Sequence, residues 1–149
     1  MKKNAWILAA LFMAFSFTAF GQNSLPAAVK TAFSKKFPTV KNAKWAKEGK
    51  TQWEAEFKLN AKSMSANFDY QGNWKETETE LSKSSLSKKL METLSNKFPG
   101  YAVKGVAFSE TPKQSVYEVV IEKGESKLEV SLDKNGKIVG QEKAGTEND

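Results

Sequence analysis

The sequence contains no cysteine, no histidine and no arginine, and each absence removes a class of chemistry. Without histidine, the chain lacks the most common general base and the side chain that changes charge near neutral pH. Without cysteine, it has no thiolate nucleophile, thiolate zinc site or disulfide, so its stability must come from core burial and hydrogen bonding. Without arginine, it lacks the planar group that reads guanine edges, and we do not expect specific nucleic-acid recognition.

All of the positive charge comes from lysine: 23 basic against 17 acidic residues give a formal net charge of +6. The lysines are interleaved with glutamates, as in KWAKEGK at 44–50, instead of forming a basic block. This spacing is typical of solvated strands and loops.

The N-terminus reads as an export signal. A short basic start, Met1-Lys2-Lys3, precedes the apolar run AWILAALFMAFSFTAF, and small residues at Ala19 and Gly21 fit a cleavage site. We therefore predict a signal peptide at 1–21, cleavage after Gly21, and a periplasmic or secreted mature protein. The alternative is an uncleaved membrane anchor, because the apolar run approaches spanning length.

The remaining residues, 22–149, are predicted to form a single domain made of two repeats, 24–81 and 85–142, followed by a short polar tail. Each repeat opens with apolar residues four apart that end at Lys-Phe-Pro, which predicts an amphipathic helix stopped by proline. The apolar positions are Leu25, Val29, Phe33 and Phe37 in the first helix and Leu86, Leu90, Leu94 and Phe98 in the second. Ser24 and Ser85 are the predicted N-caps.

After each helix the apolar period changes from four to two, which predicts half-buried antiparallel strands. The repeats align at a spacing of 61 residues in the helices and 64 in the later strands, where Trp53 matches Tyr117. The turns at Asp69 and Asp133 carry Asp-x-x-Gly, typical of a type I turn that closes a bulged hairpin. We predict an α+β fold, with one helix and about four strands per repeat, forming a continuous curved sheet backed by helices.

The order of these motifs resembles the PepSY-like family of periplasmic proteins, whose fold is similar to that of the beta-lactamase-inhibitor protein. The resemblance rests on the order of the motifs: a predicted helix, then KFP, KWAKEG and WEAEFKLNAKSMSANFDYQGNWKETETE, then a second KFPGY and YEVVIEKGESKLEVSLDKNGKI. It covers nearly all of residues 24–142. It implies two αβ repeats and an envelope protein with an inhibitory or ligand-binding role. It supplies no catalytic residue.

The run ETETE places Glu76, Glu78 and Glu80 on one face of an extended segment. Carboxylates are the ligands of hard cations, but residues two apart on a strand lie roughly 7 Å apart. The favoured interpretation is an edge strand that its charge protects from further pairing, with a cation site as the alternative.

We predict no catalytic residue, metal site or cofactor. The favoured function is an exported, non-catalytic binding module for a protein, peptide or small ligand of the cell envelope, with no membrane contact after signal cleavage. Its contact surface is predicted on the exposed, helix-free sheet face, at Glu54, Glu56, Lys58, Val116, Glu118 and Val120. The alternatives are an inhibitor of a secreted hydrolase or peptidase, which would present the loop SETPKQS at 109–115, and an enzyme built on paired carboxylates.

Overall fold

The computed structural model describes residues 25–144, so the predicted signal peptide and Ser24 lie outside the described residues. Within this range the chain divides into two compact units. The N-terminal unit comprises residues 25–80 and 109–114, and the C-terminal unit comprises residues 81–108 and 115–144. None of the helices in the described range is both long and apolar enough to cross a membrane.

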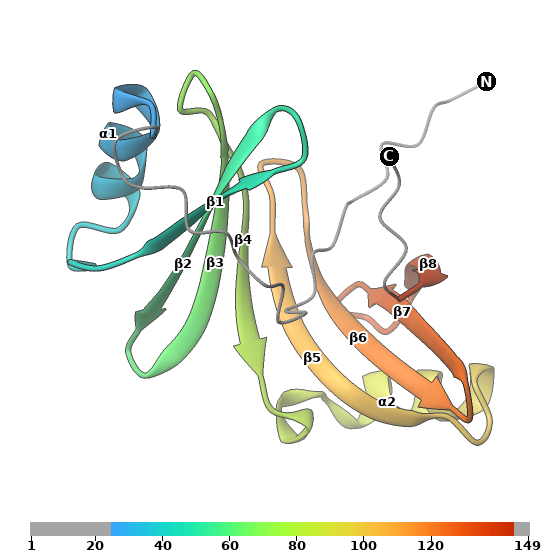
Figure 1. The fold of residues 1–149 in the computed structure, drawn as a ribbon. Helices are drawn as coiled ribbons and strands as arrows, with labels where there is room; N and C mark the ends of the chain where they lie inside the picture. Colours follow the sequence, from blue (N-terminus) through green and yellow to red (C-terminus); the bar gives the residue numbers. More distant parts are fainter. Residues whose placement is uncertain (1–24, 145–149) are drawn as a thin grey trace. The chain divides into compact units, whose positions relative to one another are not determined.

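The N-terminal unit starts with a helix and continues as antiparallel strands, each paired with the next along the chain (Figure 1). Its elements are α1 (Ala27–Lys36), β1 (Lys44–Glu48), β2 (Gln52–Leu59), β3 (Lys62–Asp69) and β4 (Trp74–Leu81). This order confirms the α+β class predicted for the first half of the chain.

The C-terminal unit has the same order of elements after a short 3-10 turn, η2 (Lys83–Ser85). Its elements are α2 (Lys88–Lys97), β5 (Ala102–Glu110), β6 (Ser115–Lys123), β7 (Ser126–Leu132) and β8 (Ile138–Lys143), with the last residues of β5 belonging to the N-terminal unit. Strand β7 pairs antiparallel with both β6 and β8.

The core of the N-terminal unit is aromatic. Phe33 of α1 lies 5.2 Å from Phe57 of β2 between ring centroids, and Phe37 lies 4.7 Å from the same ring. Trp53 and Phe68 complete the buried side of the strands. Because side chains alternate along a strand, residues 54, 56 and 58 lie on the face that has no helix.

The core of the C-terminal unit is mostly aliphatic, with Leu90 and Leu94 of α2 packed among buried valine, leucine and isoleucine side chains. Ile121 stands where the 64-residue spacing matches Phe57. A pocket whose lining includes Leu94, Phe98 and Ile121 lies beside it, and Phe98 is half-buried where Phe37 is buried. The two Lys-Phe-Pro phenylalanines therefore differ in surroundings, because their neighbours differ in size.

Both helices nevertheless end in the same way. Phe37 and Phe98 have nearly equal backbone angles (φ −126° and −127°, ψ 66° in both), and each backbone N–H donates to the carbonyl four residues earlier at 2.8 Å. A ψ of 66° lies outside the α region, which a following proline disfavours for the residue before it. The predicted helix stops are confirmed.

The two Asp-x-x-Gly turns are confirmed as well. Asp69 and Asp133 each accept backbone N–H bonds inside the turn, and Gly72 and Gly136 have φ of +83° and +79°. The hairpins that these turns close are bulged as predicted: Phe68 is the Cα partner of Trp74, and Leu132 is the Cα partner of Ile138, each beside a register shift.

The predicted N-cap of the second helix is wrong. Ser85 ends the 3-10 turn η2, and the helix begins two residues later than expected, with the hydroxyl of Ser87 accepting from the N–H of Leu90 at 3.3 Å. Either serine could cap a helix by its residue type. Because Ser85 is part of the 3-10 turn η2, the helix starts after Ser87. Helix α1 follows Pro26 and has no side-chain cap bond.

Replacing the cap gives the first prediction. Ser87→Ala removes the acceptor for a terminal helix N–H and should lower the free energy of unfolding by about 1 kcal/mol. Ser85→Ala, the matched control, should change it by less than about half of that. Urea unfolding followed by circular dichroism measures both, and equal losses would contradict the assignment of Ser87 as the cap.

The two turn glycines give the second prediction. An alanine at either position adopts a left-handed backbone, which costs roughly 1–2 kcal/mol. At Gly72 the added Cβ also lies 2.6 Å from the backbone oxygen of Ala28, whereas at Gly136 the nearest atom is the Thr93 hydroxyl oxygen at 3.0 Å. Gly72→Ala should therefore destabilise the protein more than Gly136→Ala, by at least about 1 kcal/mol. The Thr93 side chain can rotate away from an added Cβ, whereas the backbone oxygen of Ala28 cannot. If urea unfolding shows the same loss of unfolding free energy for both variants, the close contact between Gly72 and α1 is contradicted.

Candidate functional site

The helix-free face of the N-terminal unit carries three polar side chains in one row across three strands. Glu54 of β2 is the Cα partner of Asn67 of β3, and Asn67 is the Cα partner of Glu76 of β4. We call these three residues the acidic row. Each is buried, with exposed fractions of 9% for Glu54, 7% for Asn67 and 8% for Glu76. The sequence predicts Glu54 on this face, but as an exposed side chain.

Burial changes the protonation of Glu54. Loss of hydration and, to a smaller extent, the negative charges of Glu48, Glu56 and Glu76 together raise the pKa of its carboxyl to about 7, against a hydrogen bond from Ser65 that favours the ionised form. Glu54 is thus about half protonated near neutral pH.

Glu76 has the same property for a similar reason. Burial raises the pKa of its carboxyl to about 7 despite a hydrogen bond from the hydroxyl of Ser109, and the charge of Glu48 adds to the rise. Ser109 lies at the end of β5, within the same unit. Glu76 is buried and accepts a hydrogen bond from a residue of β5, whereas a side chain on an edge strand would face solvent. The edge-strand interpretation of ETETE is therefore wrong for Glu76.

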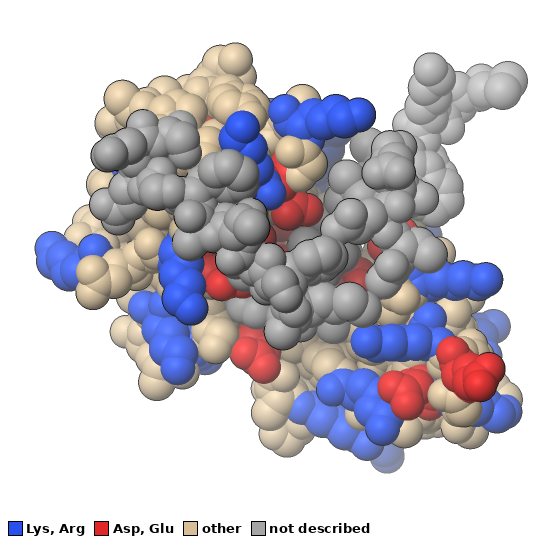
Figure 2. Space-filling view, in the orientation of Figure 1, with Lys and Arg blue, Asp and Glu red and all other residues tan. Residues whose placement is uncertain are grey.

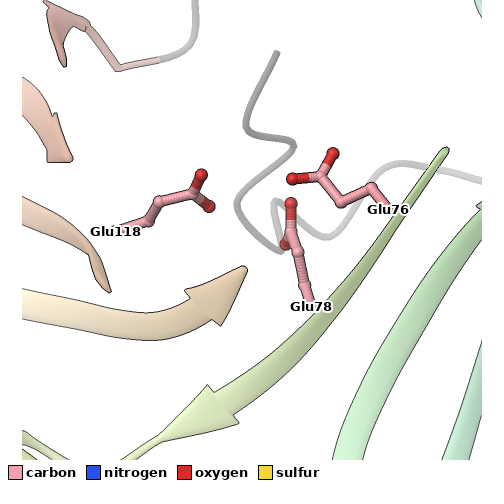
Figure 3. A group of neighbouring side chains, drawn as sticks. All are labelled: Glu76, Glu78 and Glu118. Atoms are coloured by element: carbon pink, nitrogen blue, oxygen red, sulfur yellow. The ribbon is translucent and has the colours of Figure 1, made fainter. Parts of the chain in front are cut away.

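Glu78 points toward Glu76 from the next position on the same face of β4 (Figure 3). Carboxylate oxygens of the two residues lie within 4.8 Å of each other. The strand repeat predicts a separation of roughly 7 Å between residues two apart. The carboxylates lie closer than this because the flexible glutamate side chains point toward each other. Glu78 is buried, and Glu80 is exposed.

Asn67 is the least satisfied member of the acidic row. Its side-chain oxygen Oδ1 is buried and accepts no hydrogen bond from any described residue. Buried polar atoms normally have a partner, and leaving one without costs about 1–3 kcal/mol. Asn67 was not among the predicted site residues. Its place in NFDYQGN beside a turn suggested only a polar strand position, and the register with two glutamates is a tertiary property.

Of the other predicted contact residues, only Lys58 is as exposed as expected. Lys58 is exposed and Glu56 is half-buried, whereas Val116, Glu118 and Val120 of β6 are buried in the C-terminal unit. Alternation assigns a residue to a face, but it does not say whether that face is open to solvent. The partner-binding role of these residues stays a prediction.

The outer surface matches the charge pattern of the sequence. Figure 2 shows lysines spread widely over the visible face, with acidic side chains interspersed among them. Glu54 and Glu76 are therefore buried carboxyls in a lysine-rich protein, as are Glu78, Glu118 and Glu129.

A sequence family matches this chain over residues 51–140, which is more than half of its length. The family is described as "Putative beta-lactamase-inhibitor-like, PepSY-like", and the chain belongs to it. The resemblance stated from the motifs is confirmed. Among curated proteins, nothing matches the chain.

Three solved structures with similar folds come from Bacteroides species. A DUF2874 family protein of Bacteroides uniformis has a TM-score of 0.73 and 22% identity, covering 79% of this chain and 88% of its own. A BLIP-like protein of Bacteroides fragilis has a TM-score of 0.71 and 22% identity, covering 83% and 90%. A protein of Bacteroides eggerthii described as putative periplasmic has a TM-score of 0.72 and 19% identity, covering 79% and 88%. The fold is thus similar to that of the BLIP-like proteins.

The raised pKa values give the third prediction. Because Glu54 and Glu76 titrate near 7 when folded and near 4.5 when unfolded, the folded state binds more protons between these values. The free energy of unfolding should therefore fall as pH rises from 4.5 to 7, by roughly 2.5 kcal/mol for each of the two carboxyls. Asp69, whose pKa the hydrogen bond with Lys75 lowers to about 2, loses its contribution only at lower pH.

Urea unfolding of the mature protein in EDTA at pH 5, 6, 7 and 8 measures this slope. Glu54→Gln and Glu76→Gln should each flatten it and stabilise the protein at pH 8. Glu125→Gln, in an exposed turn, should leave it unchanged. A wild-type stability that does not depend on pH in this range would show that the two carboxyls titrate normally.

Proposed function

We propose that the mature protein is an exported, non-catalytic binding module of the cell envelope, and that its ligand contacts the helix-free face of the N-terminal unit. The export pattern at 1–21 supports the location, together with the periplasmic description of a structurally similar protein. The inhibitor-like family supports a binding role. The acidic row identifies the face.

The observation that carries this proposal is the buried oxygen of Asn67 between two buried glutamates. All three side chains offer hydrogen-bond acceptors, and burial makes the negative charge of the glutamates costly. A ligand that brings positive charge or hydrogen-bond donors would satisfy Asn67 and favour the ionised glutamates. The ligand class is therefore electropositive.

The internal repeat forms part of the same proposal. Residues 24–81 and 85–142 are interpreted as two copies of one unit, because helix ends, turn glycines and bulged pairs recur at the spacings seen in the sequence. At a spacing of 64 residues Glu118 is the counterpart of Glu54. Both are buried glutamates on the helix-free side of their own unit.

A non-catalytic role follows from the side chains that the chain offers. Histidine and cysteine are absent from the sequence. The Ser109 hydroxyl donates a hydrogen bond to Glu76, but a serine nucleophile also needs donors that stabilise an oxyanion, and the partner of Ser109 is a carboxylate acceptor. The arrangement suits binding.

Inhibition of a secreted hydrolase is the second candidate, favoured by the family description. An inhibitor usually presents an aromatic or arginine side chain to its target. The expected loop at 109–115 has neither, and it closes on itself through the N–H of Thr111, which donates to the carbonyl of Gln114 at 2.8 Å. Inhibition of a secreted β-lactamase or peptidase at micromolar concentration would favour this candidate.

The fourth prediction tests the proposed face. Mature protein, residues 22–149, is immobilised and exposed to envelope extract in EDTA, and retained components are identified by mass spectrometry. We expect the wild type to retain a component that Glu54→Gln/Glu76→Gln loses, because the substitution removes charge at nearly constant volume.

Glu122→Gln/Glu125→Gln is the matched control, since it removes the same charge from positions outside the acidic row. It should retain what the wild type retains. A component held equally by all three proteins would exclude the acidic row as the contact, and the absence of any specifically retained component would contradict the binding role.

A further inference from the structure

Two carboxylates of β4 lie at a separation that one metal ion can bridge. Oxygens of Glu76 and Glu78 are within 4.8 Å of each other, and Figure 3 shows the two carboxylates turned together. Calcium–oxygen distances are about 2.4 Å, so two ligands on opposite sides of the ion lie up to about 4.8 Å apart. Two carboxylate charges this close raise each other's cost of ionisation, and a cation bound to both would lower that cost.

Asn67 provides a third oxygen, independent of the carboxylates. It is the Cα partner of Glu76 on β3, it is 93% buried, and its Oδ1 accepts no hydrogen bond from a described residue. An amide oxygen has no charge to repel, so its lack of a partner cannot be explained by titration. Side-chain amide oxygens are ordinary ligands of calcium.

Neighbouring side chains support these ligands. The Ser109 hydroxyl donates to Oε1 of Glu76, which fixes the carboxylate and leaves the other oxygen available. Outer hydrogen bonds of this kind orient metal ligands. Glu54, on the other side of Asn67, adds negative charge to the site without needing to contact the ion.

We propose that Glu76, Glu78 and Asn67 form a binding site for a hard divalent cation of the calcium class. This deepens the proposed function, because it rests on the same face and names an electropositive ligand. All three donors are oxygens, and the chain has no histidine or cysteine, so transition metals find no preferred ligand. Calcium suits the site better than magnesium, because it tolerates irregular geometry and accepts several waters as further ligands.

The fifth prediction is calcium binding by the mature, chelator-treated protein. Isothermal titration with CaCl₂ should give one site with a Kd on the order of 10⁻⁴ to 10⁻³ M, the range of extracellular calcium modules. MgCl₂ should bind at least about tenfold more weakly, because magnesium demands near-octahedral geometry. Calcium should also raise the melting temperature, since it binds only the folded state.

Three variants locate the site. Glu76→Gln and Asn67→Leu should each weaken calcium binding at least about tenfold, because each removes a ligand oxygen or its charge. Asn67→Asp, which keeps the shape and adds a charge, should strengthen it. Glu80→Gln, the matched control, removes a charge from an exposed position of the same strand and should leave the affinity within about twofold. Circular dichroism of each variant confirms folding.

The proposal is overturned if the folded wild type shows no calcium binding up to about 10 mM, ten times the weakest expected Kd. It is also overturned if Asn67→Asp binds calcium no better than the wild type, or if Glu80→Gln loses as much affinity as Glu76→Gln. The EDTA pull-down separates the two proposals. If the protein retains an envelope component but does not bind calcium, only the proposed cation site is contradicted. If it binds calcium but retains no component, only the proposed envelope partner is contradicted.

Discussion

The packing of α1 on one side of β2 and β3 is the constraint on which the rest of the N-terminal unit depends. Phe33 and Phe37 contact Phe57, and burial of these rings removes large apolar surfaces from water. Once Trp53 and Phe57 face the helix, alternation places Glu54 and Glu56 on the opposite side. A shift of one residue in strand register would exchange the two sets, so the aromatic core also positions the acidic row.

The acidic row opposes the stability that this core provides. Buried carboxyls and a buried amide oxygen without a donor both cost free energy, and the chain has polar side chains here where apolar ones would stabilise the fold. Such local conflict is expected where a protein binds something. A cation or other electropositive ligand offsets the cost, which links the stability of the folded chain to the ligand.

The family and the similar structures agree with this view at the level of the fold. The chain belongs to a beta-lactamase-inhibitor-like, PepSY-like family, and fold similarity at 19–22% identity extends over most of its length. A shared fold does not determine a shared ligand, because function resides in particular side chains. Glu54, Asn67 and Glu76 are therefore the residues on which the function of this chain must be tested.

Local patterns in the sequence determined the elements of this protein. Apolar spacing of four and then two, proline after Phe37 and Phe98, and glycine at 72 and 136 act within a few residues, so helices, strands and turns follow from them. The tertiary structure alone decided which glutamates are buried, that Asn67 lies between two of them, and that Ser109 reaches Glu76 from 33 residues away. These properties depend on the alignment of separate strands and on what excludes water from their surface, and no short segment contains that information.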